Sequence, residues 1–396
     1  MNRIILIGNG FDLAHDLNTG YRHFLDDYYL NAIKELFNPN NNHIFKDESI
    51  YFRYDYPLRT DYNDFLENIV FKNIVKHDWI PAREFHEYFG IKNQFLQIIT
   101  EKKLLQNWVD IENEYYSLLL QIIKKDVNRK YNDIKKLNSD FEGVKNLLVK
   151  YLKREIVKSI QKNENILSSI YSDFNIRDLS EKALKAYIEL LTENEIKDNP
   201  FNKSRIHQIR NRIRYNLFSK ENTSELYPEN ILFLSFNYTN IESLYIKKEE
   251  DKSNIDVIHI HGDLDNKKNN PIIFGFGDEL DDNYKVIEKL NQNEYSDNIK
   301  SIKYLETDNY KKTLEFLNSD YYQVFIFGHS CGVSDRTLLN TIFEHENCGS
   351  IKLFYYQESE FKDNYSDIIR NISRNFNSKI EMREKVVNKR YCKPLT

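Results

Sequence analysis

The chain has 396 residues, of which 40% are hydrophobic, so it is long and apolar enough for one large domain or two ordinary ones. Acidic and basic side chains nearly cancel to a net charge of -5, which argues against a generally basic nucleic-acid binder but leaves room for a local basic patch. The three cysteines are widely spaced and form no C-x-x-C pair, which excludes a zinc ribbon. The sequence has no run of about 18 apolar residues, so it predicts no membrane span.

The N-terminal element is a short apolar run. Residues 3–8 predict a buried strand that ends at a tight turn, with a helix near residues 11–17. The opening MNRIILIGNG holds too short an apolar run for a signal peptide, so we expect a soluble, cytoplasmic protein. Because the strand has no partner nearby in the sequence, we expect it to join strands from the C-terminal part of the chain.

A long, charged and mostly helical region follows. Its apolar residues recur three or four positions apart, which is the spacing of an amphipathic helix. No Gly/Ser linker interrupts the region, so we interpret residues 21–225 as an inserted helical domain. The predicted helices lie within residues 61–79, 95–125, 143–161 and 204–218.

From about residue 226 the apolar residues come in short runs. Each run is bounded by turn residues, and helical segments lie between the runs. This pattern is typical of buried, largely parallel strands. It predicts an α/β fold with a Rossmann-like, mostly parallel sheet built from residues 1–20 and 226–396. The predicted strands are 230–239, 256–262, 271–277, 321–330 and 350–356, and the predicted helices are 334–346 and 359–376.

The candidate site residues lie where these strands end, and ligands of open α/β sheets bind at that edge. The first strand is followed by Gly8, Asn9, Gly10, Phe11 and Asp12. Gly8 permits a sharp turn, Gly10 allows a phosphate to approach the backbone, and the next helix would point N–H groups at the anion. The third glycine of G-x-G-x-x-G is missing, so this is not the dehydrogenase fingerprint. Asp12 would cap the helix or meet ribose hydroxyls, and a plain strand-to-helix corner is the alternative.

Polar side chains also follow the strand that begins at residue 230. Asn237, Tyr238 and Thr239 come directly after its apolar run. The amide of Asn237 would hold a water molecule or a ribose hydroxyl. The alternative is structural, because Asn and Thr commonly end strands and cap helices.

Two histidines mark the next strand end. His259 and His261 are two residues apart, so strand alternation would place both imidazoles on one face. His261, just before Gly262, is the candidate general base, because an imidazole with a pKa near 6.5 suits proton transfer at neutral pH. His259 would support it. The rival interpretation is a metal pair completed by Asp263, His329 or Asp335.

The last strand end carries small and polar residues. Gly328, His329 and Ser330, with Asp335 further on, suit contacts with adenine or ribose, and a capped loop is the alternative. Within the predicted helix 95–125, the stretch WVDIE ends at Glu112. An acidic helix face is ordinarily solvated, but the alternative is that an acid from the insertion closes the site.

Taken in order, GNGFD, FNYT, HIHG and FGHSxGxxD resemble the motifs of the bacterial abortive-infection AbiH family, and residues 4–24 resemble its N-terminal signature. The set is also similar to the sirtuin-like superfamily, whose motifs build an NAD site. The resemblance implies catalytic roles for His261 and Asn237. Together with the strand-end positions, it predicts cofactor contacts by Gly8, Asn9, Gly10, Phe11, Asp12, Tyr21, Tyr238, Thr239, Gly262, Gly328, His329, Ser330 and Asp335. Asp12 and Thr239 depart from the sirtuin-like pattern, which has Ser and often Asp at these positions.

The resemblance implies an anti-phage effector that hydrolyses NAD, as substrate, to nicotinamide and ADP-ribose without a metal. Sirtuin zinc-ribbon cysteines are absent, so deacylation is not expected. The expected partners are NAD, a phage-derived trigger or a co-encoded protein, and a second copy of the chain, with no membrane. Two alternatives stay open: a metal-dependent hydrolase or nuclease that uses His259 and His261, and a non-catalytic nucleotide-binding sensor.

Overall fold

The computed structural model describes residues 1–36, 38–41, 44–53, 89–102, 107–157, 160–198, 211, 227–246, 253–265 and 269–396. Its centre is a six-stranded sheet in the order β11-β8-β7-β1-β5-β6, in which every neighbouring pair is parallel. The predicted α/β, Rossmann-like fold is therefore confirmed. The strands are β1 (Asn2–Ile7), β5 (Asn230–Ser235), β6 (Asn254–His259), β7 (Tyr322–Phe327), β8 (Cys348–Tyr355) and β11 (Lys393–Pro394).

The N-terminal strand joins the C-terminal strands, as expected. β1 lies between β5 and β7, so the chain adds β5 and β6 on one side of β1 and then β7, β8 and β11 on the other. Numbered along the chain, this is the strand order 3-2-1-4-5-6 of dinucleotide-binding folds. The order reverses between β1 and β7, and the carboxyl ends of those two strands flank that point.

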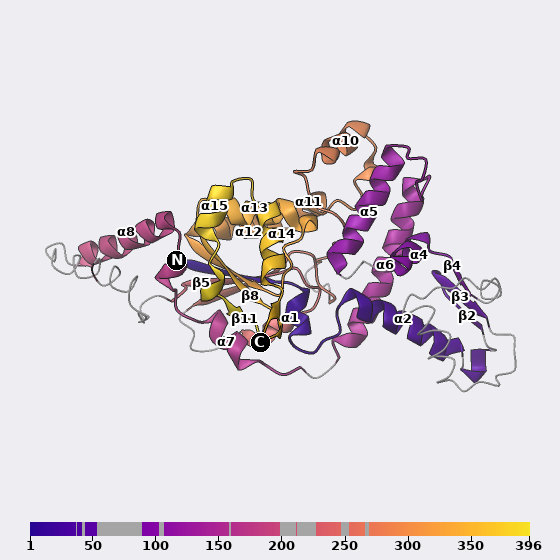
Figure 1. The fold of residues 1–396 in the computed structure, drawn as a ribbon, viewed down its shortest axis with the longest axis horizontal. Coiled ribbons are helices and arrows are strands. Elements are labelled where there is room, and N and C mark those ends of the chain that lie inside the picture. The colour runs from indigo at the N-terminus through magenta and orange to yellow at the C-terminus, as the bar shows by residue number, and fades with distance from the viewer. Residues whose placement is uncertain are drawn as a thin grey trace.

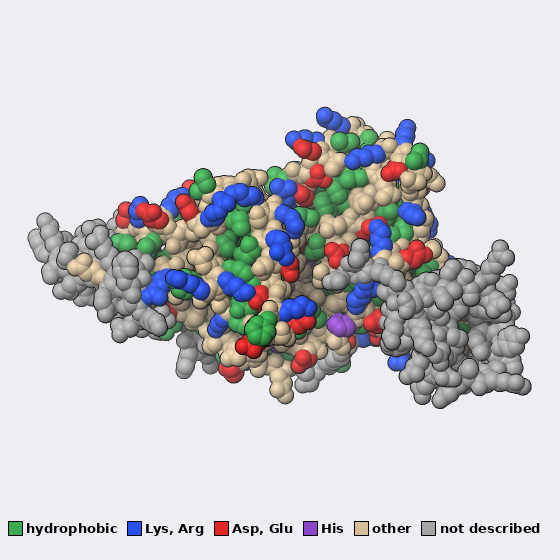
Figure 2. Space-filling view, in the orientation of Figure 1, with side chains coloured by type: hydrophobic (Ala, Val, Ile, Leu, Met, Phe, Trp, Pro, Cys, Tyr) green, Lys and Arg blue, Asp and Glu red, His purple; other side chains and the backbone are tan. Residues whose placement is uncertain are grey.

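Helices cover both faces of the sheet because β1 is apolar on both. Ile4 and Leu6 pack on the face that α13 and α14 cover, whereas Ile5 and Ile7 pack on the face that α1 and α7 cover. The helices that surround the sheet are α1 (Asn9–Leu13), α7 (Glu164–Ile170), α8 (Glu181–Asp198), α12 (Asn309–Ser319), α13 (Arg336–Glu344), α14 (Tyr365–Asn375) and α15 (Lys379–Lys385). Figure 2 shows Lys and Arg side chains gathered over α14 and α15, where Arg370, Arg374, Lys379 and Arg383 are exposed. This is a local basic patch of the kind that the composition left open.

A second body lies beyond the carboxyl edge of the sheet, on the right of Figure 1. Its core joins aromatic and aliphatic side chains of four helices to residues Leu264, Phe274 and Phe276. The helices are α2 (Tyr21–Leu36), α4 (Gln94–Glu101), α5 (Trp108–Ile123) and α6 (Ile134–Glu155). A small antiparallel sheet of β2 (Ile44–Lys46), β3 (Ile50–Arg53) and β4 (Phe89–Ile91) was not anticipated from the sequence.

Several predicted elements need correction. The helix expected over 95–125 is two helices, α4 and α5, and the helix expected over 359–376 is shortened because a hairpin of β9 (Gln357–Ser359) and β10 (Lys362–Asp363) precedes α14. The helices predicted over 61–79 and 204–218 lie outside the described residues, the latter except for residue 211. No helix within the described ranges combines the length and the apolar character needed to cross a membrane.

The predicted strand 271–277 is wrong. This apolar segment adopts no strand, apart from an isolated bridge of Phe276 to Ile299, and passes between the two bodies. Phe274 stacks on Phe141 with ring centroids 4.8 Å apart, and Phe276 stacks on Tyr116 at 3.9 Å. The segment is apolar because it is buried against α5 and α6, not because it pairs in the sheet. It leads to α10 (Asp282–Leu290) and α11 (Lys300–Lys303).

Candidate functional site

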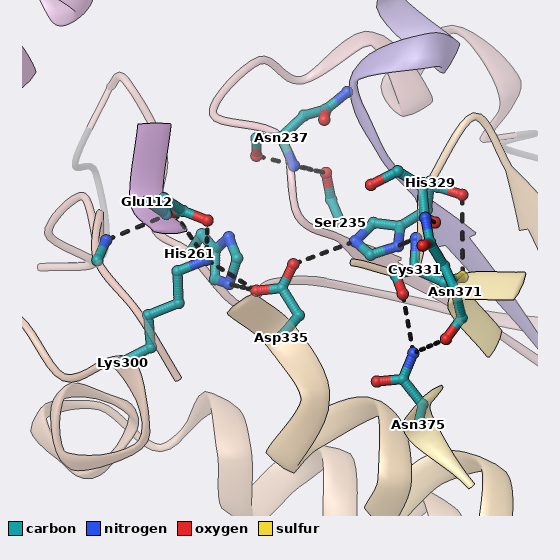
Figure 3. A network of polar contacts seen from close by, with 12 residues as sticks. Glu112, Ser235, Asn237, His261, Lys300, His329, Cys331, Asp335, Asn371 and Asn375 are labelled. Carbon is teal, nitrogen blue, oxygen red and sulfur yellow. Dashed lines mark hydrogen bonds and ion pairs between the residues drawn. The ribbon is translucent and has the colours of Figure 1, made fainter. Parts of the chain in front are cut away.

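The carboxyl edge of the sheet brings together the ends of β1, β5, β6 and β7, which are far apart in the sequence. Because all four strands are parallel, their polar terminal residues meet on one side. Figure 3 shows the result: Asp335 lies between the imidazoles of His261 and His329, and Glu112 and Lys300 approach from the other side of His261. These side chains are all buried.

The turn after β1 is packed directly on the turn after β7. Gly328 has φ +70°, and a Cβ there would come within 2.1 Å of the backbone nitrogen of Phe11. A Cβ on Gly8 would come within 2.5 Å of the Cα of His329. The N–H groups of Gly8, Gly10 and Phe11 donate to the carbonyls of Phe327, Gly328 and Gly8 at 3.1, 2.9 and 2.8 Å. The glycines thus let two backbones meet, and three N–H groups of the proposed phosphate turn already have acceptors.

Asp12 is not the cap of the first helix. Gly8 occupies the cap position of α1, and the Asp12 carboxylate lies in the interior, where it accepts hydrogen bonds from Asn237 Nδ2 at 2.8 Å and Thr239 Oγ1 at 2.8 and 2.9 Å. Burial raises the pKa of Asp12 to about 7, although the bonds from Thr239 and Asn237 act in the opposite direction. The acid therefore joins the end of β5 to the turn after β1.

The Asn237 amide is held at the same junction. Its Nδ2 donates to the Gly8 carbonyl at 3.0 Å as well as to Asp12, so both of its N–H groups have acceptors. In the part of the chain that the structure describes, no donor contacts its amide oxygen. That oxygen is the group that Asn237 can offer to a ligand.

His261 faces a carboxylate and a phenol. Its Nε2 lies 3.3 Å from Asp335 Oδ1 and 3.0 Å from the Tyr304 hydroxyl. Burial, and after it the positive charge of Lys300, lower the pKa of His261 to about 4, so its imidazole is neutral at pH 7. A neutral imidazole beside an ionised carboxylate holds its proton on the facing nitrogen. Nδ1, which no described residue contacts, is then the proton acceptor.

Asp335 is ionised because Lys300 lies beside it. The Lys300 ammonium lies 2.8 Å from Asp335 Oδ1 and 2.8 Å from Glu112 Oε2. Burial alone would raise the pKa of Asp335, but the charges of Lys300 and His261 hold it well below its usual range. Burial raises the pKa of Glu112 to about 7 against the opposing charge of Lys300. Asp335 also lies 3.6 Å from His329 Nε2.

His259 belongs to a separate set of contacts. Its Nε2 lies 3.1 Å from Glu242 Oε1, and its Nδ1 lies 3.2 Å from the Asn237 carbonyl oxygen. Burial lowers the pKa of His259, but the Glu242 carboxylate outweighs burial and raises it above its ordinary value. β6 ends at His259, so the alternation argument does not extend to His261, and the two imidazoles have different partners. Across the described ranges, no cluster of three or more His, Cys, Asp or Glu side chains could hold a metal ion.

The remaining predicted residues lie in three places. Tyr21 lies in the core of the helical body, where its hydroxyl donates to the Ile99 carbonyl, and Tyr238 donates to the Ile273 carbonyl. Asn9 and Ser330 lie at the edge itself: the Asn9 side chain accepts a hydrogen bond from Thr19, and the Ser330 carbonyl accepts one from Asn371. Gly262 forms the turn after β6.

Sequence reasoning did not identify Lys300 and left two interpretations of Glu112 open. Lys300 was not recognised, because it lies in a polar stretch with other lysines and nothing local marks it as buried. For Glu112 the alternatives were an acid on a solvated helix face and an acid that closes the site. Its side chain is 4% exposed and bonds to Lys300, which supports the second alternative. An amphipathic pattern that places an acid among apolar residues was the available signal.

The family comparison agrees with the ordered motifs. A family model described as bacteriophage abortive infection AbiH matches residues 4–357. No curated protein matches the chain, and no solved structure does. The match extends over nearly all of the sheet and the helical body, and so includes every candidate site residue. The chain therefore belongs to the bacteriophage abortive infection AbiH family, and its role is in defence against bacteriophage.

Proposed function

We propose that this protein acts in phage defence by hydrolysing NAD to nicotinamide and ADP-ribose. One observation carries the proposal: contacts run from Gly8 to His329, from His329 to Asp335 and from Asp335 to His261, across the point where the strand order reverses. Dinucleotides bind at that point in sheets with this strand order. The resemblance of the four motifs to sirtuin-like NAD sites supports the choice of NAD.

The reaction requires little bond chemistry from the protein. Hydrolysis breaks the bond from ribose C1′ to the cationic nicotinamide nitrogen, which keeps the electron pair and leaves as a neutral ring. The water oxygen forms the new bond to C1′, and one water proton is taken by a base. Positioning of the two reactants is therefore the larger part of catalysis.

His261 Nδ1 is the base in this proposal, because Asp335 holds the ring proton on Nε2. A positioned general base contributes a factor on the order of 10²–10⁴ in rate. The amide oxygen of Asn237 orients the water or a ribose hydroxyl. Because the N–H groups of Gly8, Gly10 and Phe11 already have acceptors, the proposal gives the diphosphate contacts to Asn9 and the 328–330 turn rather than to Gly10 and Phe11.

The direct test is incubation of the purified protein with NAD, followed by chromatography for free nicotinamide. We expect nicotinamide release that falls at least a hundredfold in His261→Asn, on the scale of a lost general base. His345→Asn is the matched control, because His345 follows α13 and contacts Tyr322 at the opposite edge of the sheet.

The same assay is repeated with extract of phage-infected cells, because a defence enzyme requires an inactive state in healthy cells. Release of nicotinamide at equal rates by the wild type and His261→Asn would remove His261 from the site. Tight NAD binding without turnover under both conditions would contradict hydrolysis and favour the non-catalytic sensor.

A further inference from the structure

Helix α5 of the helical body contacts both sides of the point where the strand order reverses. On the β1 side, Trp108 Nε1 donates to the Thr19 carbonyl at 2.9 Å, and Thr19 donates to the Asn9 side chain at 2.8 Å. On the β7 side, Val109 packs against Gly332: a Cβ on Gly332 would come within 2.6 Å of Val109 Cγ1. Glu112 lies one turn further along α5. The helix is thus fixed in a position that delivers the Glu112 carboxylate to the site.

Glu112 reaches the site through one cation. Its Oε2 bonds to Lys300, Lys300 bonds to Asp335, and Asp335 faces His261, with successive distances of 2.8, 2.8 and 3.3 Å. Its Oε1 accepts from the backbone N–H of Gly275 at 3.4 Å. Lys300 is 1% exposed, and Asp335 and Glu112 raise its pKa even though burial lowers it. The cation is therefore permanent.

The sum of these charges decides whether His261 can hold a proton. With Glu112 ionised, two carboxylates and one ammonium give the buried cluster a net charge of about -1, so a proton on His261 brings it to neutrality. With Glu112 neutral, the same proton leaves an uncompensated buried positive charge, which is costly. The charge of Glu112 and the basicity of His261 are therefore linked.

We infer that Glu112, supplied by the helical body, is a positioning residue for His261, whose acceptance of a proton depends on the negative charge of Glu112 acting through Lys300 and Asp335. The inference deepens the proposed function and rests on it. Glu112 touches neither His261 nor the reacting atoms in this arrangement. It gives the helical body a chemical part in the site as well as a structural one.

The other ionisable groups around His261 do not replace Glu112. Tyr304 is buried and Tyr238 is partly buried, and burial raises the pKa of each phenol well above its ordinary value, so both stay neutral. Burial likewise raises the pKa of Cys331 and keeps its thiol neutral. His329 faces the second oxygen of Asp335 at 3.6 Å and carries no negative charge. Among the described residues, Glu112 is thus the acid of this cluster whose pKa lies near neutral pH; Asp12, whose pKa is also about 7, bonds to Asn237 and Thr239 instead.

The test compares Glu112→Gln with Glu114→Gln, an acid on the same helix that pairs with Lys102 and does not touch the cluster. Because the pKa of Glu112 is about 7, we expect kcat/KM of the wild type for NAD to rise by a factor on the order of 10–10² as the pH increases to about 7, and to level above it. Glu112→Gln should lack this rise and be lower by a factor on the order of 10–10². Glu114→Gln should match the wild type, and Glu112→Asp should recover the rise. An unchanged profile in Glu112→Gln would overturn the inference and leave the proposed function standing.

A second measurement needs no turnover. The ring signals of His261 in NMR spectra, assigned by their loss in His261→Asn, should shift with an inflection near pH 7 as Glu112 ionises. Glu112→Gln should abolish that inflection and Glu114→Gln should retain it, while thermal unfolding confirms that each variant is folded. Retention of the inflection in Glu112→Gln would overturn the inference. Failure of the wild type to release nicotinamide, with the inflection behaving as expected, would count against NAD hydrolysis alone.

Discussion

Asp335 Oδ1 lies 3.3 Å from His261 Nε2, although the two residues follow strands on opposite sides of β1. The contact passes over the ends of β1 and β5, and the Phe236 ring lies beneath it, with its centroid 5.1 Å from that of His261 and 4.2 Å from that of His329. A buried carboxylate that is ionised and aimed at an imidazole fixes the orientation of the ring and the nitrogen that carries its proton.

The first prediction concerns Asp335→Asn. The change removes the charge that holds the Nε2 proton of His261 and leaves Lys300 with Glu112 as its one remaining carboxylate. We expect nicotinamide release to fall by a factor on the order of 10², and the free energy of unfolding to fall by about 3–5 kcal/mol because a buried ion pair loses one partner. Steady-state kinetics and urea unfolding measure the two effects.

The control for this prediction is Asp278→Asn. Asp278 lies 3.3 Å from Arg336, which follows Asp335 and begins α13, and it makes no contact with His261 among the described residues. It should lose stability without a comparable loss of turnover per folded molecule. Equal losses of turnover in the two variants would show that Asp335 acts through folding alone.

The second prediction concerns the contact between the two turns. Gly328→Ala places a Cβ 2.1 Å from the Phe11 nitrogen at a φ of +70°, so we expect the free energy of unfolding to fall by more than about 2 kcal/mol. Gly90→Ala is the control, because no atom of the described part of the chain lies within 4 Å of its Cβ position. Similar midpoints of urea unfolding for the two variants would contradict the close packing of the turns.

The parallel sheet and the edge that carries the site could be predicted because both depend on local patterns, whereas the strand order became known only from the structure. Short apolar runs that end in Gly8, Asn237 and Gly328 mark strand ends, and parallel strands gather such ends on one side. The same reasoning predicted a strand at 271–277, where there is none, because burial between two bodies selects the same apolar residues as burial in a sheet. Lys300 could not be found, because its partners Glu112 and Asp335 lie 188 and 35 residues away and only the fold brings them together.

The third prediction is a pH dependence that belongs to Asp12. Its folded pKa is about 7 and its ordinary value is 3.8, so the folded state keeps the proton that the unfolded state loses. Stability should therefore fall as pH rises from about 4 to 7, by about 4 kcal/mol in total, and should not change further above pH 7 on account of this group.

The comparison that isolates Asp12 is the difference in unfolding free energy between the wild type and Asp12→Asn at pH 4.5 and pH 7.5. The asparagine cannot ionise, so the variant should gain stability relative to the wild type as pH rises. Asp282→Asn, whose side chain is fully exposed, should show no such drift. A difference that is constant across this pH range would mean that Asp12 is ionised in the folded protein at pH 4.5.

The last prediction concerns Phe274, which connects the helical body to the segment that crosses the edge of the sheet. Its ring is 2% exposed, stacks on Phe141 and meets Trp108 edge-on at 6.1 Å. Phe274→Ala should therefore lower the free energy of unfolding by about 3–5 kcal/mol.

Because β1 and β7 have their own core, hydrogen exchange in Phe274→Ala should accelerate in α5 and α6 and leave the amides of β1 and β7 protected. Phe361→Ala, at a position 92% exposed, should change neither property. Since α5 carries Glu112, nicotinamide release by Phe274→Ala should fall with the protection of α5; acceleration of exchange throughout the sheet would show instead that the helices and the sheet unfold as one unit.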